Sequence, residues 1–140
     1  MSKINIGRVL LGGLVAGLVL NIGEFVLNGM VLAKQMEAEF HRLNLTPPGA
    51  SFIAKAVVMT FILGIAIVFV YAMIRPRFGA GARTAIIAGV TAWFFAYVYV
   101  GVINGALGLT SGNLVLVGIV WGVFEYAIAA IAGAWVYKEA

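Results

Sequence analysis

Four long apolar stretches constrain this chain more than any other feature of its sequence. They cover residues 9–33, 52–74, 84–107 and 114–137. A bilayer core of about 30 Å is crossed by roughly 20 apolar residues in a helix, and each stretch is long enough. Strands of a membrane barrel would alternate apolar and polar residues, and these stretches do not. We therefore predict an all-α membrane protein with four transmembrane helices.

The composition supports a membrane location and excludes several other classes of protein. Hydrophobic residues make up 64% of the 140 residues and charged residues 10%, whereas soluble domains contain about 25% charged residues. The net charge of +4 does not indicate nucleic-acid binding, because the basic residues lie at the ends of the apolar stretches. The absence of cysteine excludes disulfides and iron–sulfur clusters. We expect a single membrane domain over residues 1–140, with no nucleic-acid partner.

The start of the chain has some features of a secretory signal peptide, because Lys3 and Arg8 precede an apolar run over residues 9–20. A cleaved leader would continue into a short polar region. Residues 21–33 are instead long and mostly apolar, and they include Glu24. We therefore expect this segment to be retained as the first membrane helix.

The connection after the first helix contains an amphipathic segment. Met36, Phe40 and Leu43 are spaced four and three residues apart, which places them on one face of a helix. We predict an amphipathic extension over residues 34–45, outside the membrane or lying on its surface. Two consecutive prolines then prevent the helix from continuing.

Basic residues gather on one side of the predicted membrane. If the N-terminus is cytoplasmic, the inner side holds Lys3, Arg8, Arg75, Arg77, Arg83 and Lys138, and the outer side Lys34, Arg42 and Lys55. The positive-inside rule then favours a cytoplasmic location for both termini. The four helices would form two helical hairpins in a compact bundle.

Two carboxylates lie inside the apolar stretches. Glu24 is ten residues from Lys34 at the outer end of its helix, which places it about 15 Å deep at 1.5 Å per residue. Glu125 is eleven residues from Leu114, and therefore about 16 Å deep. A charged side chain near the bilayer midplane costs roughly 2.5–3.5 kcal/mol. We expect both side chains to face protein partners or to hold a proton.

Small residues share a helix face with each glutamate. In the first helix the face consists of Gly13, Gly17, Asn21, Glu24 and Asn28, and in the fourth of Gly118, Gly122, Glu125, Ala129 and Gly133. Small residues allow two helix backbones to approach closely. We predict that the two faces pack against each other and bring Glu24 and Glu125 to the same depth.

Two main interpretations of the glutamates stay open. In the structural one, they share a proton or hydrogen-bond to polar side chains and so orient the helices. The candidate partners are Asn21, Asn28, Asn104, Tyr97 and Thr91. In the functional one, the pair takes up and releases a proton or cation. A polar anchor for a partner helix, lipid, quinone or pigment is a further alternative.

No catalytic residue, metal site or cofactor is predicted. The glutamates are accompanied by no nucleophile, metal set or substrate-binding loop. Glu37 and His41 are one turn apart, but two ligands without a third do not make a zinc site. A lipid-modifying enzyme that uses these residues with Glu39 and Arg42 is a distant alternative.

The most distinctive segment runs from Asn21 to Gly29 and begins Asn-Ile-Gly-Glu-Phe. With the proline break and the second pair of helices, the whole chain resembles small four-helix bacterial inner-membrane proteins that have no assigned activity. The resemblance implies the architecture and a bacterial inner-membrane location, and no activity.

We expect a non-enzymatic membrane subunit or accessory protein. Its partners would be the lipid bilayer and either other membrane protein subunits or further copies of itself. The alternative is a small proton-linked transporter or ion carrier that works as a homo-oligomer through Glu24 and Glu125.

Overall fold

The four apolar stretches form four long helices in the computed structural model, which describes residues 3–140. The helices run over Ile6–Val31, Ala50–Phe78, Ala82–Ala106 and Gly112–Val136. Each is long and apolar enough to cross a bilayer. Over the described range the fold is all-α, and it has the four candidate membrane-spanning helices of a multi-pass membrane protein.

Two of the four long helices contain a π-helical segment. The first consists of α1 (Ile6–Val26) and η1 (Leu27–Val31), and the third of α4 (Ala82–Trp93), η2 (Phe94–Tyr99) and α5 (Val100–Ala106). The second and fourth are the continuous helices α3 (Ala50–Phe78) and α6 (Gly112–Val136). The predicted amphipathic extension is a separate short helix, α2 (Ala33–Arg42), which begins after Leu32.

The helix ends follow local signals. The Asn5 side chain accepts a hydrogen bond from the Arg8 backbone N–H at 3.1 Å and caps the start of α1. Asn44 adopts the left-handed conformation with φ 53°, just beyond the end of α2. Helix α3 extends beyond the apolar stretch over residues 52–74 and continues through Pro76 to Phe78. A proline so close to a helix end removes only one backbone hydrogen bond.

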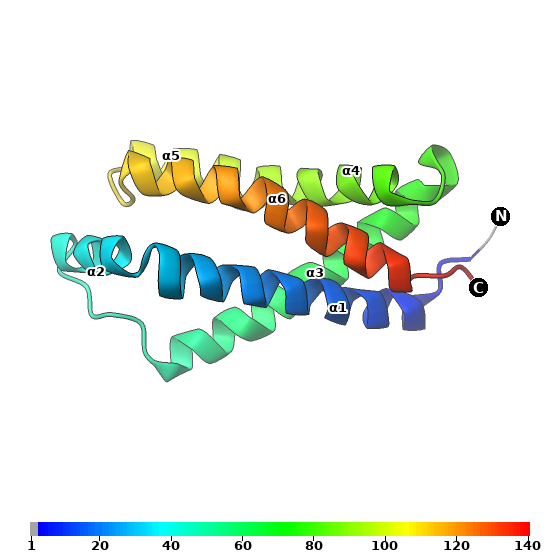
Figure 1. The fold of residues 1–140 in the computed structure, drawn as a ribbon, viewed down its shortest axis with the longest axis horizontal. Coiled ribbons are helices and arrows are strands. Elements are labelled where there is room, and N and C mark those ends of the chain that lie inside the picture. The colour runs from blue at the N-terminus through cyan, green and yellow to red at the C-terminus, as the bar shows by residue number, and fades with distance from the viewer. Residues whose placement is uncertain (1–2) are drawn as a thin grey trace.

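The two ends of the bundle differ (Figure 1). Helix α1 packs along α3 and α6, and α4 packs along α6 and α3. The N- and C-terminal segments lie together at one end, which we call the terminal end. Helix α2 lies at the opposite end, which we call the α2 end.

The buried core is concentrated toward the terminal end. Ala16, Val68 and Ala129 are 0% exposed there. Toward the α2 end, α3 diverges from the other helices (Figure 1), and none of its residues 50–63 is buried. A smaller cluster at this end consists of Leu27, Leu32 and Leu114. The bundle is therefore closely packed near the termini and looser near α2.

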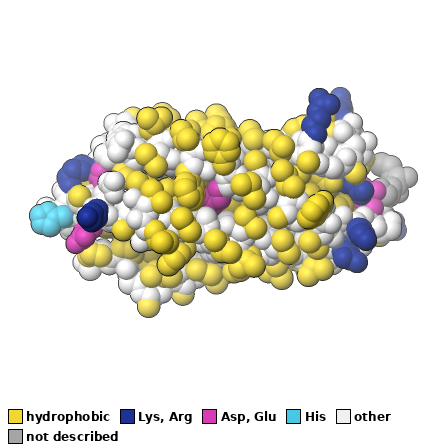
Figure 2. All heavy atoms as spheres, viewed as in Figure 1, with side chains coloured by type: hydrophobic (Ala, Val, Ile, Leu, Met, Phe, Trp, Pro, Cys, Tyr) yellow, Lys and Arg dark blue, Asp and Glu magenta, His cyan; other side chains and the backbone are white. Residues whose placement is uncertain are grey.

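The surface agrees with a bilayer environment. Figure 2 shows apolar side chains along the length of the molecule and charged side chains gathered at its two ends. It also shows an acidic group in the middle of this apolar surface. That position is consistent with the predicted depth of Glu24 and Glu125 within the membrane-spanning helices.

The glycine face of the first helix packs against α3. A Cβ atom on Gly13 would lie 2.5 Å from Ile65 Cγ1, and one on Gly17 would lie 2.6 Å from Phe61 Cδ1. On the α3 side, a Cβ on Gly64 would lie 2.5 Å from the Gly13 carbonyl oxygen. The three glycines therefore allow the closest approach between α1 and α3.

Of the glycines on the two predicted faces, Gly133 does lie between the first and fourth helices, but the prediction was wrong for Gly118 and Gly122 as it was for Gly13 and Gly17. A Cβ on Gly118 would lie 3.1 Å from the Tyr97 ring, and one on Gly122 would lie 2.8 Å from it. Helix α1 meets α6 through Gly12 instead, where a Cβ would lie 2.5 Å from the Gly133 carbonyl oxygen. Successive residues are about 100° apart around a helix. Neighbouring glycines on α1 therefore face different helices of the bundle.

Candidate intramembrane carboxyl site

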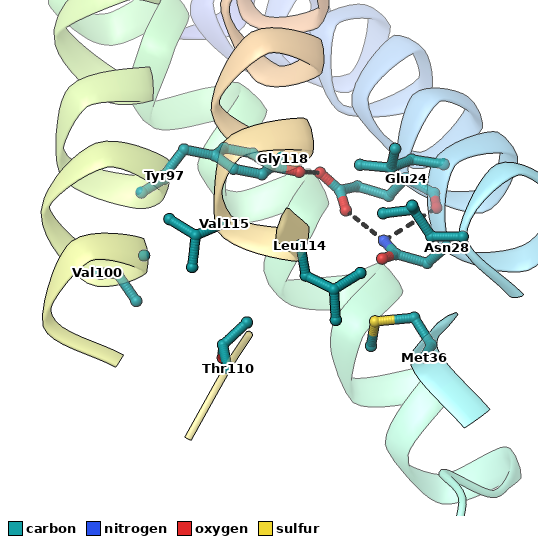
Figure 3. A pocket seen from close by; sticks show the side chains of 13 residues that line it. Glu24, Asn28, Met36, Tyr97, Val100, Thr110, Leu114, Val115 and Gly118 are labelled. Carbon is teal, nitrogen blue, oxygen red and sulfur yellow. Dashed lines mark hydrogen bonds between the residues drawn. The ribbon is translucent and has the colours of Figure 1, made fainter. Parts of the chain in front are cut away.

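Glu24, near the end of α1, is held by two side chains from the π segments (Figure 3). The Tyr97 hydroxyl of η2 donates a hydrogen bond to Glu24 Oε1. The Asn28 amide of η1 donates to Glu24 Oε2 at 2.9 Å. Both carboxylate oxygens of this residue therefore have a partner, and the contact to Tyr97 joins the first membrane-spanning helix to the third.

The π segment η1 helps to place the Asn28 side chain. The Leu32 N–H donates to the carbonyl of Leu27, five residues earlier, at 2.7 Å. The Asn28 amide also donates to the Glu24 backbone carbonyl at 3.2 Å. Such π segments are frequent at functional sites, and both of those described here border the same carboxyl group.

Glu125 lies on α6 directly against α1. It is 7% exposed, and a Cβ on Gly23 would lie 2.7 Å from its carboxyl carbon. The glycine therefore leaves the space that the carboxyl group occupies. Neither Glu125 oxygen has a hydrogen-bond partner among the described residues, and neither has the buried Trp121 Nε1 one turn earlier.

The structure brings the two carboxyl groups together. Glu125 packs on Gly23, the residue next to Glu24, so the two carboxyl groups are near enough to interact electrostatically. Tyr126, 4% exposed, packs edge-on against Tyr97 with ring centroids 5.6 Å apart. The site therefore combines two glutamates with Tyr97, whose ring is held by Tyr126, within an apolar bundle.

A cavity of about 240 Å³ extends from Glu24 toward the α2 end. Figure 3 shows Tyr97 and Val100 on one side, Asn28 and Met36 on the other, and Leu114 between them. The full lining is Glu24, Leu27, Asn28, Leu32, Met36, Ala96, Tyr97, Val100, Gly101, Thr110, Leu114, Val115 and Gly118. The cavity is thus mainly apolar, with the carboxylate at one boundary.

Helix α2 is attached to the loop between α5 and α6 at this end. Arg42 Nη2 forms an ion pair with Glu39 at 2.5 Å and donates to the Gly108 carbonyl at 3.1 Å. The Ser111 N–H donates to Glu39 Oε1 at 3.1 Å. Thr110 in the same loop and Met36 of α2 both line the cavity. The attachment of α2 therefore holds two parts of the cavity wall together.

This attachment is expected to weaken in acid. Hydrogen bonds from Ser111 and Arg42 hold the pKa of Glu39 below its ordinary value of 4.5. A depressed folded-state pKa gives a contribution to stability that is present above the unfolded value and lost as pH falls through the folded one. We expect the α2 amides to lose hydrogen-exchange protection as pH falls below 4.5.

Hydrogen–deuterium exchange, corrected for its intrinsic pH dependence, measures this change. The variant Glu39→Gln is expected to have weak α2 protection at neutral pH, where the wild-type chain is protected. Wild-type protection that does not change across the acid range would contradict the prediction.

The other predicted partners form no hydrogen bond with either glutamate in the described part of the chain. Asn21 donates to the Gly17 carbonyl at 3.0 Å and to the Val57 carbonyl of α3 at 3.4 Å. The Asn104 backbone carbonyl accepts from the Leu109 N–H at 2.9 Å. Thr91 donates to the carbonyl of Ile87. Of the predicted partners, the structure places Asn28 and Tyr97 on Glu24.

Three neighbours of the pair were not predicted. Gly23 directly precedes Glu24, but its role depends on α6 lying against it. Trp121 is one turn from Glu125 in the sequence, and this spacing is the available signal for it. Tyr126 becomes a neighbour through its packing on Tyr97. Over residues 3–140, no three His, Cys, Asp or Glu side chains form a group that fits a metal ion.

The chain matches no protein-family model, no curated protein and no solved structure. The resemblance to small four-helix bacterial membrane proteins therefore stays a prediction.

Proposed function

We propose that this chain is a non-enzymatic multi-pass membrane protein that takes up and releases a proton at the Glu24–Glu125 pair. In this proposal the protein is a proton-linked transporter or ion carrier, and the movement of the proton drives the transport of a substrate across the bilayer. In this proposal it resides in a bacterial inner membrane with both termini in the cytoplasm. The α2 end and the cavity then face the outside. The basic residues assigned to the cytoplasmic side support this orientation.

The observation that supports the proposal best is the environment of Glu125. Both of its oxygens are buried without a protein partner in the described part of the chain. An isolated carboxylate in such a place is strongly disfavoured, and two adjacent carboxyl groups do not both ionise easily. A single proton held between Glu24 and Glu125 avoids both an isolated buried carboxylate and a pair of adjacent negative charges.

A purely structural role fits this geometry less well. Buried polar groups that serve only to orient helices are normally fully hydrogen-bonded. Glu24 meets that condition through Tyr97 and Asn28, whereas Glu125 does not. A group that must exchange its proton is instead better left without permanent partners.

The packing on either side of the pair also supports transport. Toward the α2 end lies the cavity. Toward the terminal end, close glycine contacts bring α1 against α6 and α3, and Tyr126 closes the bundle beside the pair. A site that is accessible from one side at a time is the arrangement required for alternating access. Four helices enclose little space, so we propose that the protein works as a homo-oligomer.

Proton flux into vesicles tests this function. The purified protein is reconstituted into liposomes that contain a pH-sensitive dye, and a potassium diffusion potential drives protons inward. We expect flux above that of protein-free liposomes, and a return to the protein-free rate in both Glu24→Gln and Glu125→Gln. Glu37→Gln is the matched control, because Glu37 lies exposed on α2 away from the pair. Wild-type flux equal to the protein-free rate, or equal flux in all variants, would contradict the proposal.

Gly23→Ala tests the contact between α1 and the Glu125 carboxyl group. The added methyl group would lie 2.7 Å from the Glu125 carboxyl carbon and 2.8 Å from its Cγ. Because the carboxyl group ends a flexible side chain, we expect it to move while the fold is kept, with a loss of stability below about 1 kcal/mol. Proton flux should fall severalfold at a nearly unchanged thermal midpoint. Normal flux in a folded variant would show that the position of this carboxyl is unimportant.

A second candidate function is an accessory subunit of a larger membrane complex. It is favoured by α3, whose residues 50–63 diverge from the bundle and are not buried. Exposed apolar residues on this segment include Phe52, Ile53, Val58 and Met59. Purification in a mild detergent should then recover other subunits in fixed ratio. Recovery of the chain alone, or of its homo-oligomer, would count against this function.

A further inference from the structure

We propose that the cavity beside Glu24 binds a small organic cation with an apolar body. This inference rests on the proposed function, because it identifies the class of substrate that the proton would exchange with. The charge, the apolar walls and the size of the cavity each restrict the kind of ligand that it can bind.

The charge of the lining favours a cation. Among the described lining residues, Glu24 has the only carboxyl group, and no lysine or arginine takes part. Of the basic residues on α2, Arg42 is already paired with Glu39 and with the Gly108 carbonyl, and Lys34 is exposed and is not among the lining residues. A cationic ligand would therefore meet a carboxylate without a competing positive charge, whereas an anion would meet only repulsion.

The walls favour an organic cation over a metal ion. Hard metal cations need several oxygen ligands around them. This cavity presents mostly carbon, from Leu27, Leu32, Val100 and Leu114 among others. Ligand pockets for organic molecules have this combination of apolar walls with a few polar groups. The ring of Tyr97 also lines the cavity, and aromatic faces attract organic ammonium groups.

Asn28 supplies a further polar contact. Its amide nitrogen donates to Glu24, which leaves its Oδ1 atom without a partner in the described part of the chain. Figure 3 shows the Asn28 amide next to the cavity, between Glu24 and Met36. An ammonium N–H at this position would find both a carboxylate and an amide oxygen. A quaternary ammonium would use the carboxylate and the tyrosine ring alone.

The size limits the ligand. The volume of about 240 Å³ would hold about eight water molecules at roughly 30 Å³ each. It therefore fits an organic cation of about ten non-hydrogen atoms, below the usual range for drug-sized pockets. Benzyltrimethylammonium has this size and charge. Neopentylbenzene has the same shape without the charge.

Equilibrium binding of radiolabelled benzyltrimethylammonium to the detergent-purified protein tests the inference. We expect saturable binding that unlabelled benzyltrimethylammonium displaces and neopentylbenzene does not. Glu24→Gln should weaken binding by at least about tenfold, because it removes the charge. Val100→Trp should abolish binding by filling the cavity, since Val100 lines the cavity and is 45% exposed. Glu37→Gln is the control and should bind normally.

The comparison of the two probes uses wild-type protein, so it does not depend on any variant folding. Equal displacement by neopentylbenzene would show an apolar site without cation preference and would overturn the inference. Absence of saturable binding would also overturn it. If proton flux persists while no cation binds, the proposed function stands and the substrate class is wrong. If the cation binds but proton flux is absent even in liposomes loaded with it, the site stands and the proposed transport is wrong.

Discussion

Gly64→Ala is expected to destabilise the protein more than any other small substitution in the membrane-spanning helices. The new methyl group would lie 2.5 Å from the Gly13 carbonyl oxygen and 2.7 Å from the Gly17 Cα. These are backbone atoms, so no side chain can move aside, and α1 and α3 must separate. Overpacking of a close contact costs about 1–3 kcal/mol and sometimes more. We expect the upper end of that range.

The thermal unfolding midpoint in detergent measures this effect. Gly112→Ala is the matched control, because no other atom lies within 4 Å of the position of its added Cβ. The control should change stability by less than about 0.5 kcal/mol. If the two variants unfold at the same temperature, α1 and α3 do not pack in the way described.

Glu125→Met is expected to stabilise the fold. Methionine has a similar length and needs no hydrogen bond, whereas both Glu125 oxygens are buried without a partner. A proton shared with Glu24 would bond only one of these oxygens, so removing the other, unsatisfied one recovers about 1–3 kcal/mol. A residue kept for function at the expense of stability should respond in this way.

Glu24→Met is the counterpart and should destabilise the protein. It removes the acceptor for the Tyr97 hydroxyl and for the Asn28 side-chain amide. We therefore expect the two variants to shift the unfolding midpoint in opposite directions. A loss of stability in Glu125→Met equal to that in Glu24→Met would support a structural role for the pair instead.

Much of the architecture could be predicted because membrane-spanning helices are determined locally. The lipid environment requires every backbone polar group to be satisfied within the helix, so hydropathy and length suffice to locate the four helices. The depths of Glu24 and Glu125 follow from the helix rise alone. The proximity of Glu24 and Glu125 was also predicted, from the helix faces that carry them, and α1 and α6 do lie side by side.

The details of packing could not be predicted from a single helix. A helix in a bundle contacts two neighbours, and a shift of one residue changes the neighbour that it faces. Gly13 was therefore predicted to contact α6. In the structure Gly13 faces α3, and its neighbour Gly12 contacts α6. The π segments depend on tertiary contacts, and no local pattern indicates them. The cavity likewise depends on tertiary packing, since residues of α1, η1, α2, η2, α5 and α6 line it together.

The central claim is that Glu24 and Glu125 together hold one exchangeable proton in the bilayer. Infrared difference spectroscopy of the protein in lipid measures it directly, since a protonated carboxyl group has its own carbonyl stretching band. We predict one such band near neutral pH, which shifts in deuterated water, disappears in Glu125→Gln, moves in frequency in Glu24→Gln and is unchanged in Glu37→Gln. A spectrum without this band, or one in which the band survives both substitutions, would contradict the claim.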